Sequence, residues 1–187
     1  MPHIAILSSS IRTGRNSNRL ALYFKNFLEE NKLATVEILD LEEYNFPLFT
    51  ERLRLQTSPS SATLDFANKI KLADGILIVT PEYNGGYPAS LKNAIDLLYD
   101  EWYRKPVSIA TVSSGPFGGS QVIMQLQFTL WKMRAWTAPS TFPAPKVEEA
   151  FDEKGNATSK ESTDKRAASF INELLWCIEA KQKMILK

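Results

Sequence analysis

Short apolar runs alternate with amphipathic stretches along most of the chain. Four of these runs are bounded by small or polar residues, which is typical of buried strands. They cover residues 3–9, 35–41, 74–80 and 106–114. Between the runs, apolar residues recur at helical spacing, and Leu20, Phe24 and Leu28 mark the first such helix. This alternation requires crossover connections, so it predicts a parallel sheet with helices on both faces.

Helical periodicity and turn residues place the remaining elements. A fifth strand is expected within residues 141–149, where prolines weaken the pattern, and residues 42–61 form a long connection. Further helices are predicted over residues 64–73, 89–102, 120–136 and 162–183. The fold class that fits is a single α/β domain over residues 1–187. We expect a flavodoxin-like, doubly wound sheet of five parallel strands in the order 2-1-3-4-5.

Three loops rich in glycine or polar residues follow the first, third and fourth predicted strands. In a sheet of this kind the ligand binds beyond the carboxyl ends of the strands, where the strand order reverses. That point lies between strands one and three, and strand four is the next neighbour. The three loops are therefore expected to meet at one site.

The first loop has the composition of an anion-binding segment. The stretch SSSIRTGRNSNRLA, residues 8–21, carries hydroxyl, amide and guanidinium groups and leads into a helix N-terminus. Backbone N–H groups and the helix dipole favour phosphate there, and arginine can hold two phosphate oxygens. The alternative is an ordinary helix cap formed by Ser17 or Asn16. Neither GxGxxG nor GK[ST] is present, so a mononucleotide with a terminal phosphate is favoured.

The second and third loops allow a flat ring to approach the backbone. In TPEYNGGYPASLKNAIDLL, residues 80–98, Gly85 and Gly86 lack a Cβ and Tyr83 offers an aromatic face. In SSGPFGG, residues 113–119, glycines and serines repeat the arrangement. The alternatives are a plain tight turn and a glycine-rich turn before a helix. Together with the first loop, the pattern favours a flavin, which is a planar heterocycle tethered to a phosphate.

The three segments together resemble the NADPH-dependent FMN reductase family of flavodoxin-like proteins. PEYNGGYPASLKNAID is the specific part, the order and spacing cover residues 4–121, and Ser9-Ser10 stands where many members have Gly-Ser. The resemblance implies non-covalent FMN, held at its phosphate, along its isoalloxazine ring and at its pyrimidine side. The implied phosphate contacts are Ser10, Arg12, Ser17 and Asn18, with Arg15 and Asn16 as further candidates; the ring loop is Pro81, Glu82, Tyr83, Asn84 and Gly85; the pyrimidine contacts are Ser114, Gly115 and Gly118.

The resemblance also implies an enzyme. NADPH, the cosubstrate, passes hydride to flavin N5, and the reduced flavin passes electrons to a small acceptor, such as a quinone, an azo compound, a metal oxyanion or free flavin. No catalytic side chain and no metal site are expected, and Glu82 is interpreted as structural because hydride transfer to a flavin needs no general acid. Two other classes stay open, namely a flavodoxin-like electron carrier and an FMN-binding redox sensor with little turnover.

Charge and composition narrow the partners. The net charge is +1, from 22 basic and 21 acidic residues. This balance lacks the excess of basic residues that is typical of nucleic-acid-binding proteins. It also differs from the strong acidity of typical flavodoxins. A single cysteine excludes an internal disulfide and is typical of a reducing compartment. No apolar run approaches the roughly 20 residues of a membrane span, and no signal peptide is recognised. We therefore expect a cytoplasmic protein without membrane contact.

The helix predicted over residues 120–136 carries two apolar stripes. One stripe suffices for packing on a sheet, whereas the second, with Met124, Phe128 and Trp131, needs another partner. The helix at 89–102 shows a similar excess. A symmetric homodimer through these two helices is therefore expected, and the sequence leaves open whether dimers pair into tetramers.

Overall fold

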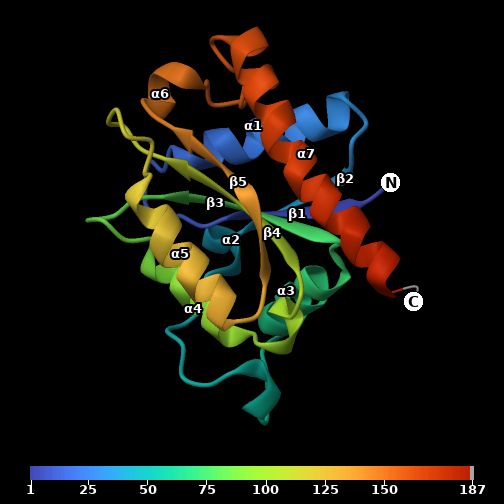
Figure 1. Cartoon of the computed structure of the whole chain (residues 1–187). Coiled ribbons are helices and arrows are strands. Elements are labelled where there is room, and N and C mark those ends of the chain that lie inside the picture. Colours follow the sequence, from blue (N-terminus) through green and yellow to red (C-terminus); the bar gives the residue numbers. More distant parts are fainter. Residues whose placement is uncertain (186–187) are drawn as a thin grey trace.

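One sheet of five parallel strands organises the computed structural model, which describes residues 1–185 (Figure 1). Its strand order, β2-β1-β3-β4-β5, confirms the prediction. The last two residues of the predicted domain, 186 and 187, lie outside the described residues. The strands are β1 His3–Ser8, β2 Thr35–Asp40, β3 Gly75–Pro81, β4 Pro106–Val112 and β5 Trp136–Ala144.

Helices cover both faces of the sheet. Their bounds are α1 Ser17–Glu30, α2 Leu41–Tyr44, α3 Ser61–Leu72, α4 Ala89–Leu97, α5 Gln121–Lys132, α6 Val147–Ala150 and α7 Lys160–Ile185, with 3-10 turns η1 Leu53–Leu55 and η2 Asp100–Trp102. α1, α6 and α7 pack on one face, and α2 to α5 pack on the other (Figure 1). The sheet is therefore the middle of three layers, as the alternating pattern predicted.

The central strand β1 shows why both faces are covered. Ile4 and Ile6 belong to the core under α1 and α7, whereas Ala5 and Leu7 belong to the core under α3 and α4. All four side chains are fully buried. A parallel strand that is buried on both faces needs a continuous apolar run, which explains the pattern at residues 3–9.

The fifth strand begins earlier than predicted, and the helix before it is shorter. The prediction of a helix over 120–136 is wrong at its end, because α5 stops at Lys132. A fifth strand was expected within 141–149, and the structure places its start earlier, because β5 runs from Trp136 to Ala144. The short helix α6 takes up most of the remaining residues.

Local backbone chemistry explains this correction. Arg134 takes a left-handed φ of 60°, which ends the helical path and directs the chain into β5. Pro139 and Pro143 are tolerated inside the strand because β5, whose one partner among residues 1–185 is β4, lies at the edge of the sheet. The prolines that weakened the sequence pattern are thus compatible with an edge strand.

Other boundaries also differ from the predictions. The helix predicted over 89–102 ends at Leu97, and η2 forms the rest as a separate turn. The connection predicted over 42–61 contains α2 and η1, and α3 begins before the predicted residue 64. The last helix runs beyond the predicted 162–183 at both ends.

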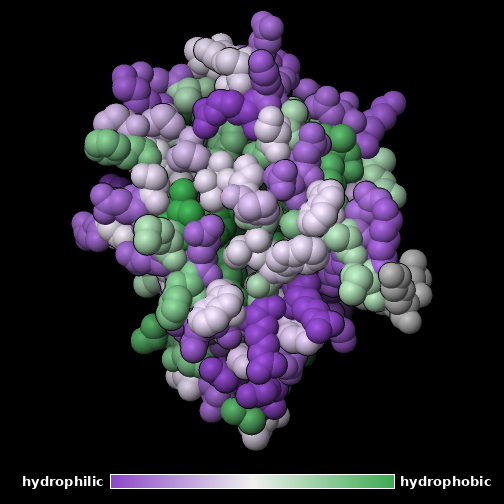
Figure 2. Space-filling model, in the orientation of Figure 1, coloured by the Kyte–Doolittle hydropathy of each residue, from purple (hydrophilic) through white to green (hydrophobic). Residues whose placement is uncertain are grey.

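Large apolar side chains are exposed on α5. Met124, Phe128 and Trp131, here called the α5 patch, have 79%, 63% and 65% of their surface exposed. In the orientation of Figure 1, the space-filling view shows apolar side chains reaching the surface over α5 (Figure 2). α4 does not share this feature, because its large apolar side chains are buried in the core. The second stripe expected on two helices is therefore found on α5 alone.

The longest helix, α7, has 26 residues and packs against β5 and β4. It carries the only cysteine, Cys177, which is 1% exposed. Burial raises the pKa of the Cys177 thiol. Although α7 is long enough to span a bilayer, none of the helices within residues 1–185 combines that length with sufficient apolar character.

Candidate functional site

The loops that follow β1, β3 and β4 meet at the carboxyl edge of the sheet and enclose a pocket of about 140 Å³. Ligand pockets usually measure about 300–1,000 Å³, so this one suits a phosphate group rather than a whole nucleotide. The predicted residues that line it are Ser10, Arg12, Arg15, Asn16, Ser17, Pro81, Glu82, Tyr83 and Ser114. The site therefore draws on all three loops.

Helix α1 begins at this pocket without a capping side chain. Asn16 occupies the N-cap position, but its side chain forms no cap hydrogen bond and donates to Glu148 instead. Ser17 is buried and lines the pocket, and its Oγ has no hydrogen-bond partner among the described residues. The cap that was the alternative for this loop is not formed. An unpaired hydroxyl and the first N–H groups of a helix at one pocket are suited to bind an anion.

Arg15 ties the first loop to the end of β2. Its guanidinium forms two contacts with the Asp40 carboxylate, with Nη2 and Oδ2 at 2.5 Å, and reaches Glu42 at 2.7 Å. It also donates to the carbonyl oxygen of Ser10 at 2.9 Å. The hydrogen bond to Asp40, together with nearby carboxylates, raises the pKa of Arg15 although partial burial opposes this. Arg15 is thus fully engaged within the protein and holds the loop in shape.

Arg12 and Asn18 differ in their relation to the pocket. Arg12 is exposed at the pocket, and its guanidinium has no hydrogen bond or ion pair within residues 1–185. The side chain of Asn18 does not line the pocket, and its Oδ1 accepts a hydrogen bond from Ser8 at 3.4 Å. The positive charge that the first loop offers to a ligand therefore comes from Arg12.

Two hydroxyl contacts join the first loop to the second loop and α4. Ser10 Oγ and Tyr83 Oη lie 2.7 Å apart and share a hydrogen bond. Ser90, in the first turn of α4, donates from its Oγ to the carbonyl oxygen of Ser9 at 2.6 Å. These contacts hold the Tyr83 ring at the pocket and fix the distance between the two loops.

The second loop forms a two-residue hairpin turn. Tyr83 and Gly86 exchange N–H···O bonds of 2.8 and 3.0 Å, and Asn84 and Gly85 between them take left-handed φ angles of 53° and 80°. Asn-Gly is the pair that such a turn favours, so the tight-turn alternative accounts for these two residues. Gln125 of α5 donates to the Gly85 carbonyl at 2.7 Å. Asn84 and Gly85 do not line the pocket.

The residues of the third loop have different surroundings. Ser114 lines the pocket, and a Cβ added at the exposed Gly115 would meet open space. Gly118 is buried with a φ of 62°, and a Cβ there would lie 2.9 Å from the backbone nitrogen of Ala144. Its carbonyl accepts a hydrogen bond from Thr111 at 2.6 Å. Packing against β5 therefore requires Gly118, whereas Ser114 and Gly115 remain accessible to a ligand.

The sequence analysis did not single out four residues that line the pocket, which are Gly14, Val112, Ser113 and Val147. Gly14 and Ser113 lie within the quoted first and third loops but were not named as contacts, and Val112 is the last residue of β4, directly before the third loop. Val147 comes from α6, which was not predicted. Nothing in the sequence pattern indicated that this turn of helix reaches the site.

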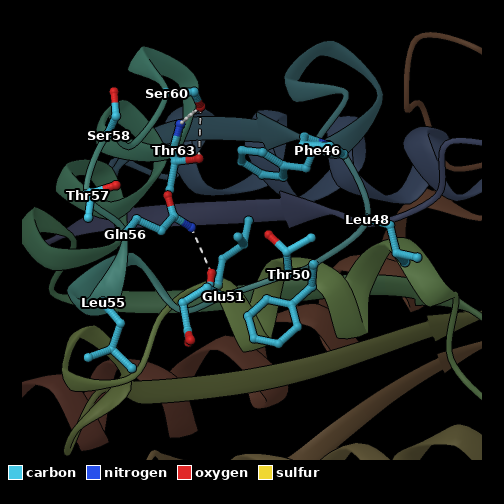
Figure 3. Close-up of a pocket in the computed structure, with 13 residues that line it drawn as sticks. Phe46, Leu48, Thr50, Glu51, Leu55, Gln56, Thr57, Ser58, Ser60 and Thr63 are labelled. Atoms are coloured by element: carbon cyan, nitrogen blue, oxygen red, sulfur yellow. Dashed lines mark hydrogen bonds between the residues drawn. The ribbon is translucent and has the colours of Figure 1, made fainter.

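A larger pocket, of about 450 Å³, lies within the connection between β2 and α3 (Figure 3). Ser60 caps α3 here, because its Oγ accepts from the N–H of Thr63 at 3.1 Å. Asn93 of α4 holds the connection by accepting from the N–H of Phe49 at 2.5 Å and donating to the carbonyl of Pro47 at 2.9 Å. None of the residues lining this pocket belongs to the three loops, so this pocket is distinct from the candidate site.

Comparison with known proteins identifies similar sequences and folds. A family model described as NADPH-dependent FMN reductase matches residues 2–149. An NAD(P)H-dependent FMN reductase of Saccharomyces cerevisiae is 34% identical over 140 residues, which cover 68% of this chain and 72% of that protein. Another of that description, from Schizosaccharomyces pombe, is 34% identical over 147 residues, covering 76% and 72%.

Among solved structures, the flavoenzyme NAD(P)H:(acceptor) oxidoreductase FerB from Paracoccus denitrificans superposes with a TM-score of 0.78. The match covers 96% of this chain and 98% of that one at 22% sequence identity. At this identity the likeness shows the fold alone.

We expect Arg15→Gln to lower the free energy of unfolding by about 1–3 kcal/mol, because it leaves the nearly buried Asp40 carboxylate without its partner. The matched control is Arg12→Gln, in the same loop but exposed and unpaired, which is expected to change stability by less than about 0.5 kcal/mol. Urea denaturation of both variants without ligand measures the difference. Equal stabilities of the two variants would contradict the role assigned to Arg15.

Proposed function

Because this chain belongs to the NADPH-dependent FMN reductase family, we propose that it uses NADPH to reduce a small acceptor through bound FMN. The class of activity is that of an NAD(P)H-dependent oxidoreductase, and the cofactor of the family is FMN. The proposal adds the route of the hydride, the preference for NADPH over NADH, and an acceptor that is a quinone, an azo compound, a metal oxyanion or free flavin.

The observation that carries the proposal is the uncapped start of α1. A phosphate monoester has a charge of about −1.5 to −2 and accepts several hydrogen bonds. It would satisfy the unpaired Ser17 hydroxyl, meet the positive end of the helix dipole and attract the exposed Arg12 guanidinium. Ser10 adds a hydroxyl, and Asn18 adds a backbone N–H in the first turn of the helix. We assign the phosphate of FMN to this pocket.

The flavin ring is too large for the pocket, so it is assigned to the surface formed by the second and third loops. Pro81, Glu82 and Tyr83 border the pocket on one side, and Ser114 borders it on the other. The space next to the Gly115 Cα is open, so a ring edge could approach the loop there, whereas the Gly115 carbonyl already accepts from the N–H of Lys146 and the hydroxyl of Ser113. This arrangement is compatible with one face of a planar ring against the protein and the other toward substrates.

Three predicted ring contacts are given supporting roles in this proposal. Asn84 and Gly85 form the turn that presents Tyr83, and Gly118 anchors the third loop against β5. Replacing any of these three residues would change the conformation of its loop without removing a side chain that lines the pocket. Their effect on FMN binding is therefore expected to be indirect.

The protein residues would hold FMN and set its position and charge environment, and FMN would supply the redox chemistry, namely acceptance of a hydride from NADPH and electron transfer to the acceptor. Arg12 and the helix dipole neutralise the phosphate, and the Ser10–Tyr83 hydrogen bond keeps the two loops in register. Arg15 maintains the loop conformation through Asp40. No proton transfer is assigned to Glu82.

We also propose a homodimer in which the α5 patch is covered by the second copy. Isolated exposed apolar residues are common, but Phe128 and Trp131 lie in contact, with ring centroids 5.8 Å apart, and Met124 precedes them by about one turn of the same helix. A two-fold axis through such a patch would bury both copies of it at once. The pairing of dimers into tetramers is left open.

A cytoplasmic location is part of the proposal. It is supported by the single cysteine, which is a free and buried thiol, and by the nicotinamide nucleotide that the family uses. Detection of the protein in the cytosolic fraction of its own cells, with none in the medium, is the expected outcome.

Binding and turnover together test the function. FMN is expected to bind one site per chain, with quenching of flavin fluorescence, and the loaded protein is expected to oxidise NADPH when a quinone is supplied. Because both substrates use the same flavin in turn, initial-rate plots at several quinone concentrations should be parallel. Absence of FMN binding would remove the proposal. Binding without turnover on a quinone, an azo dye or ferricyanide would indicate a redox sensor instead.

Ser17→Ala tests the assignment of the phosphate. We expect FMN affinity to fall by about 10-fold or more, since a hydrogen bond to a charged group is lost, while stability without FMN stays within about 0.5 kcal/mol. Ser108→Ala is the matched control, because Ser108 Oγ is also buried and unpaired but lies in β4, away from the pocket. Fluorescence titration and urea denaturation provide the two readouts. Equal FMN affinities in the two variants would place the phosphate elsewhere.

Trp131→Glu tests the dimer. A buried carboxylate in the centre of the α5 patch is expected to shift the protein from dimer to monomer on light scattering at micromolar concentration. Trp176→Glu, which changes another exposed tryptophan on α7, is expected to leave the dimer intact. A dimer of unchanged mass in the Trp131→Glu variant would show that the α5 patch is not the interface.

A further inference from the structure

A further cavity lies at the opposite edge of the sheet from the candidate site. It measures about 600 Å³ and is formed where β4 and β5 begin, next to the last turns of α7. Its volume falls within the range of about 300–1,000 Å³ that is usual for small-molecule sites. The residues that line it are Tyr103, Arg104, Arg134, Trp136, Lys181 and Met184. None of them belongs to the three loops.

The walls of this cavity are mainly apolar. Tyr103, Trp136 and Met184 are 48%, 37% and 70% exposed, so much of their apolar surface is open to solvent. The indole of Trp136 is held edge-to-face against Trp176, with ring centroids 6.2 Å apart, and is therefore fixed in orientation. A flat apolar ligand would cover this surface and gain the corresponding transfer free energy.

Three cations surround the apolar walls, and their charge is not compensated locally. Arg104, Arg134 and Lys181 form no ion pair with any side chain of residues 1–185. Burial lowers the pKa of Lys181, with the charge of Asp74 acting in the opposite direction. Asp74 itself accepts from the backbone N–H of His3 at 2.8 Å and from Gln182 at 3.3 Å.

A fourth cation lies close behind the cavity. Lys105 is 4% exposed and donates from Nζ to the carbonyl oxygens of Lys71, at 3.0 Å, and Ala73. Burial, and then the charge of Lys181, lower the pKa of Lys105 to about 8. Asp74 is the carboxylate whose charge acts on both Lys105 and Lys181, and Arg104 and Arg134 add two further positive charges at the cavity. A ligand that enters the cavity is therefore favoured if it carries a negative charge.

The two arginines are held in place by the backbone. The N–H of Arg104 donates to the carbonyl of Arg134 at 2.8 Å, and the N–H of Trp136 donates to the carbonyl of Lys105 at 2.9 Å. The Arg104 guanidinium lies 5.1 Å from the centre of the Tyr103 ring. The backbone positions of both arginines are therefore fixed on adjacent turns, and both side chains line the cavity.

We propose that this cavity binds a planar aromatic anion, such as an aryl carboxylate or aryl sulfonate, at a site separate from that of FMN. The aromatic part would lie against Trp136 and Met184, and the anionic group would meet Arg104, Arg134 and Lys181. A polar phosphate ester would leave the apolar walls uncovered, and a neutral aromatic molecule would leave the cations without a partner. Only a ligand with both properties matches the cavity.

Calorimetric titration of the FMN-loaded protein with naphthalene-1-sulfonate tests this site. We expect saturable binding with a Kd between roughly 10 µM and 1 mM, as suits a ligand of this size. The double variant Arg104→Gln/Arg134→Gln is expected to bind at least about 10-fold more weakly, since two charge-assisted contacts are lost. Arg104 and Arg134 both have left-handed φ angles, of 53° and 60°. Glutamine is no less compatible with this conformation than arginine, so the two changes add no backbone strain.

Two controls test where the ligand binds and whether its charge is needed. Lys132→Gln removes a charge beside the α5 patch, where the Lys132 ammonium lies 5.6 Å from the Trp131 ring, and is expected to leave the affinity unchanged. Naphthalene-1-sulfonamide, which is neutral, is expected to bind at least about 10-fold more weakly than the sulfonate, since the charge-assisted contacts are lost. Lys181→Gln provides a second variant if the double variant does not fold. Affinity that is unaffected by the arginine changes, or absence of saturable binding, would overturn the proposal.

Discussion

Parallel pairing of β1, β3 and β4 makes the chain leave the sheet three times at the same edge. Because helices cover both faces, these exits are where polar groups can gather without breaking the core. The polar first loop, the Asn-Gly hairpin and the glycine loop are distant in sequence, but the strand order brings them together. The position of the site is thus a consequence of topology, and its chemistry is a consequence of what each loop contains.

The first loop is held open for a ligand by interactions that do not themselves bind it. Arg15 uses its guanidinium on Asp40, Glu42 and the Ser10 carbonyl, and Asn16 turns to Glu148 instead of capping α1. The helix N-terminus and Ser17 are left unsatisfied as a result. A loop that satisfied its own donors would be more stable alone and less able to bind phosphate. In the proposed site, the residues that support the loop are therefore different from those assigned to the phosphate.

The sequence was sufficient for the sheet order and for the loops that form the site, because buried parallel strands and polar loop segments leave strong periodic and compositional signals. It was insufficient where a residue's role depends on a distant partner. Arg12 and Arg15 are alike in the sequence. Only the position of Asp40 shows that Arg15 forms an ion pair, whereas Arg12 lies exposed at the pocket. Gly115 and Gly118 differ in the same way, since the contact with β5 cannot be read from the loop. The start of β5 was missed because helical periodicity continues past Lys132, whereas the backbone turns at Arg134.

The burial of Cys177 has a consequence for the chemistry in which the protein is proposed to take part. Quinones, one of the proposed classes of acceptor, are electrophiles that add readily to thiolates. Cys177 is both inaccessible and disfavoured as a thiolate, and it is the only sulfhydryl group of the chain. Covalent alkylation by its own acceptors would therefore require the molecule to open first, so resistance to such inactivation is expected to follow the stability of the fold.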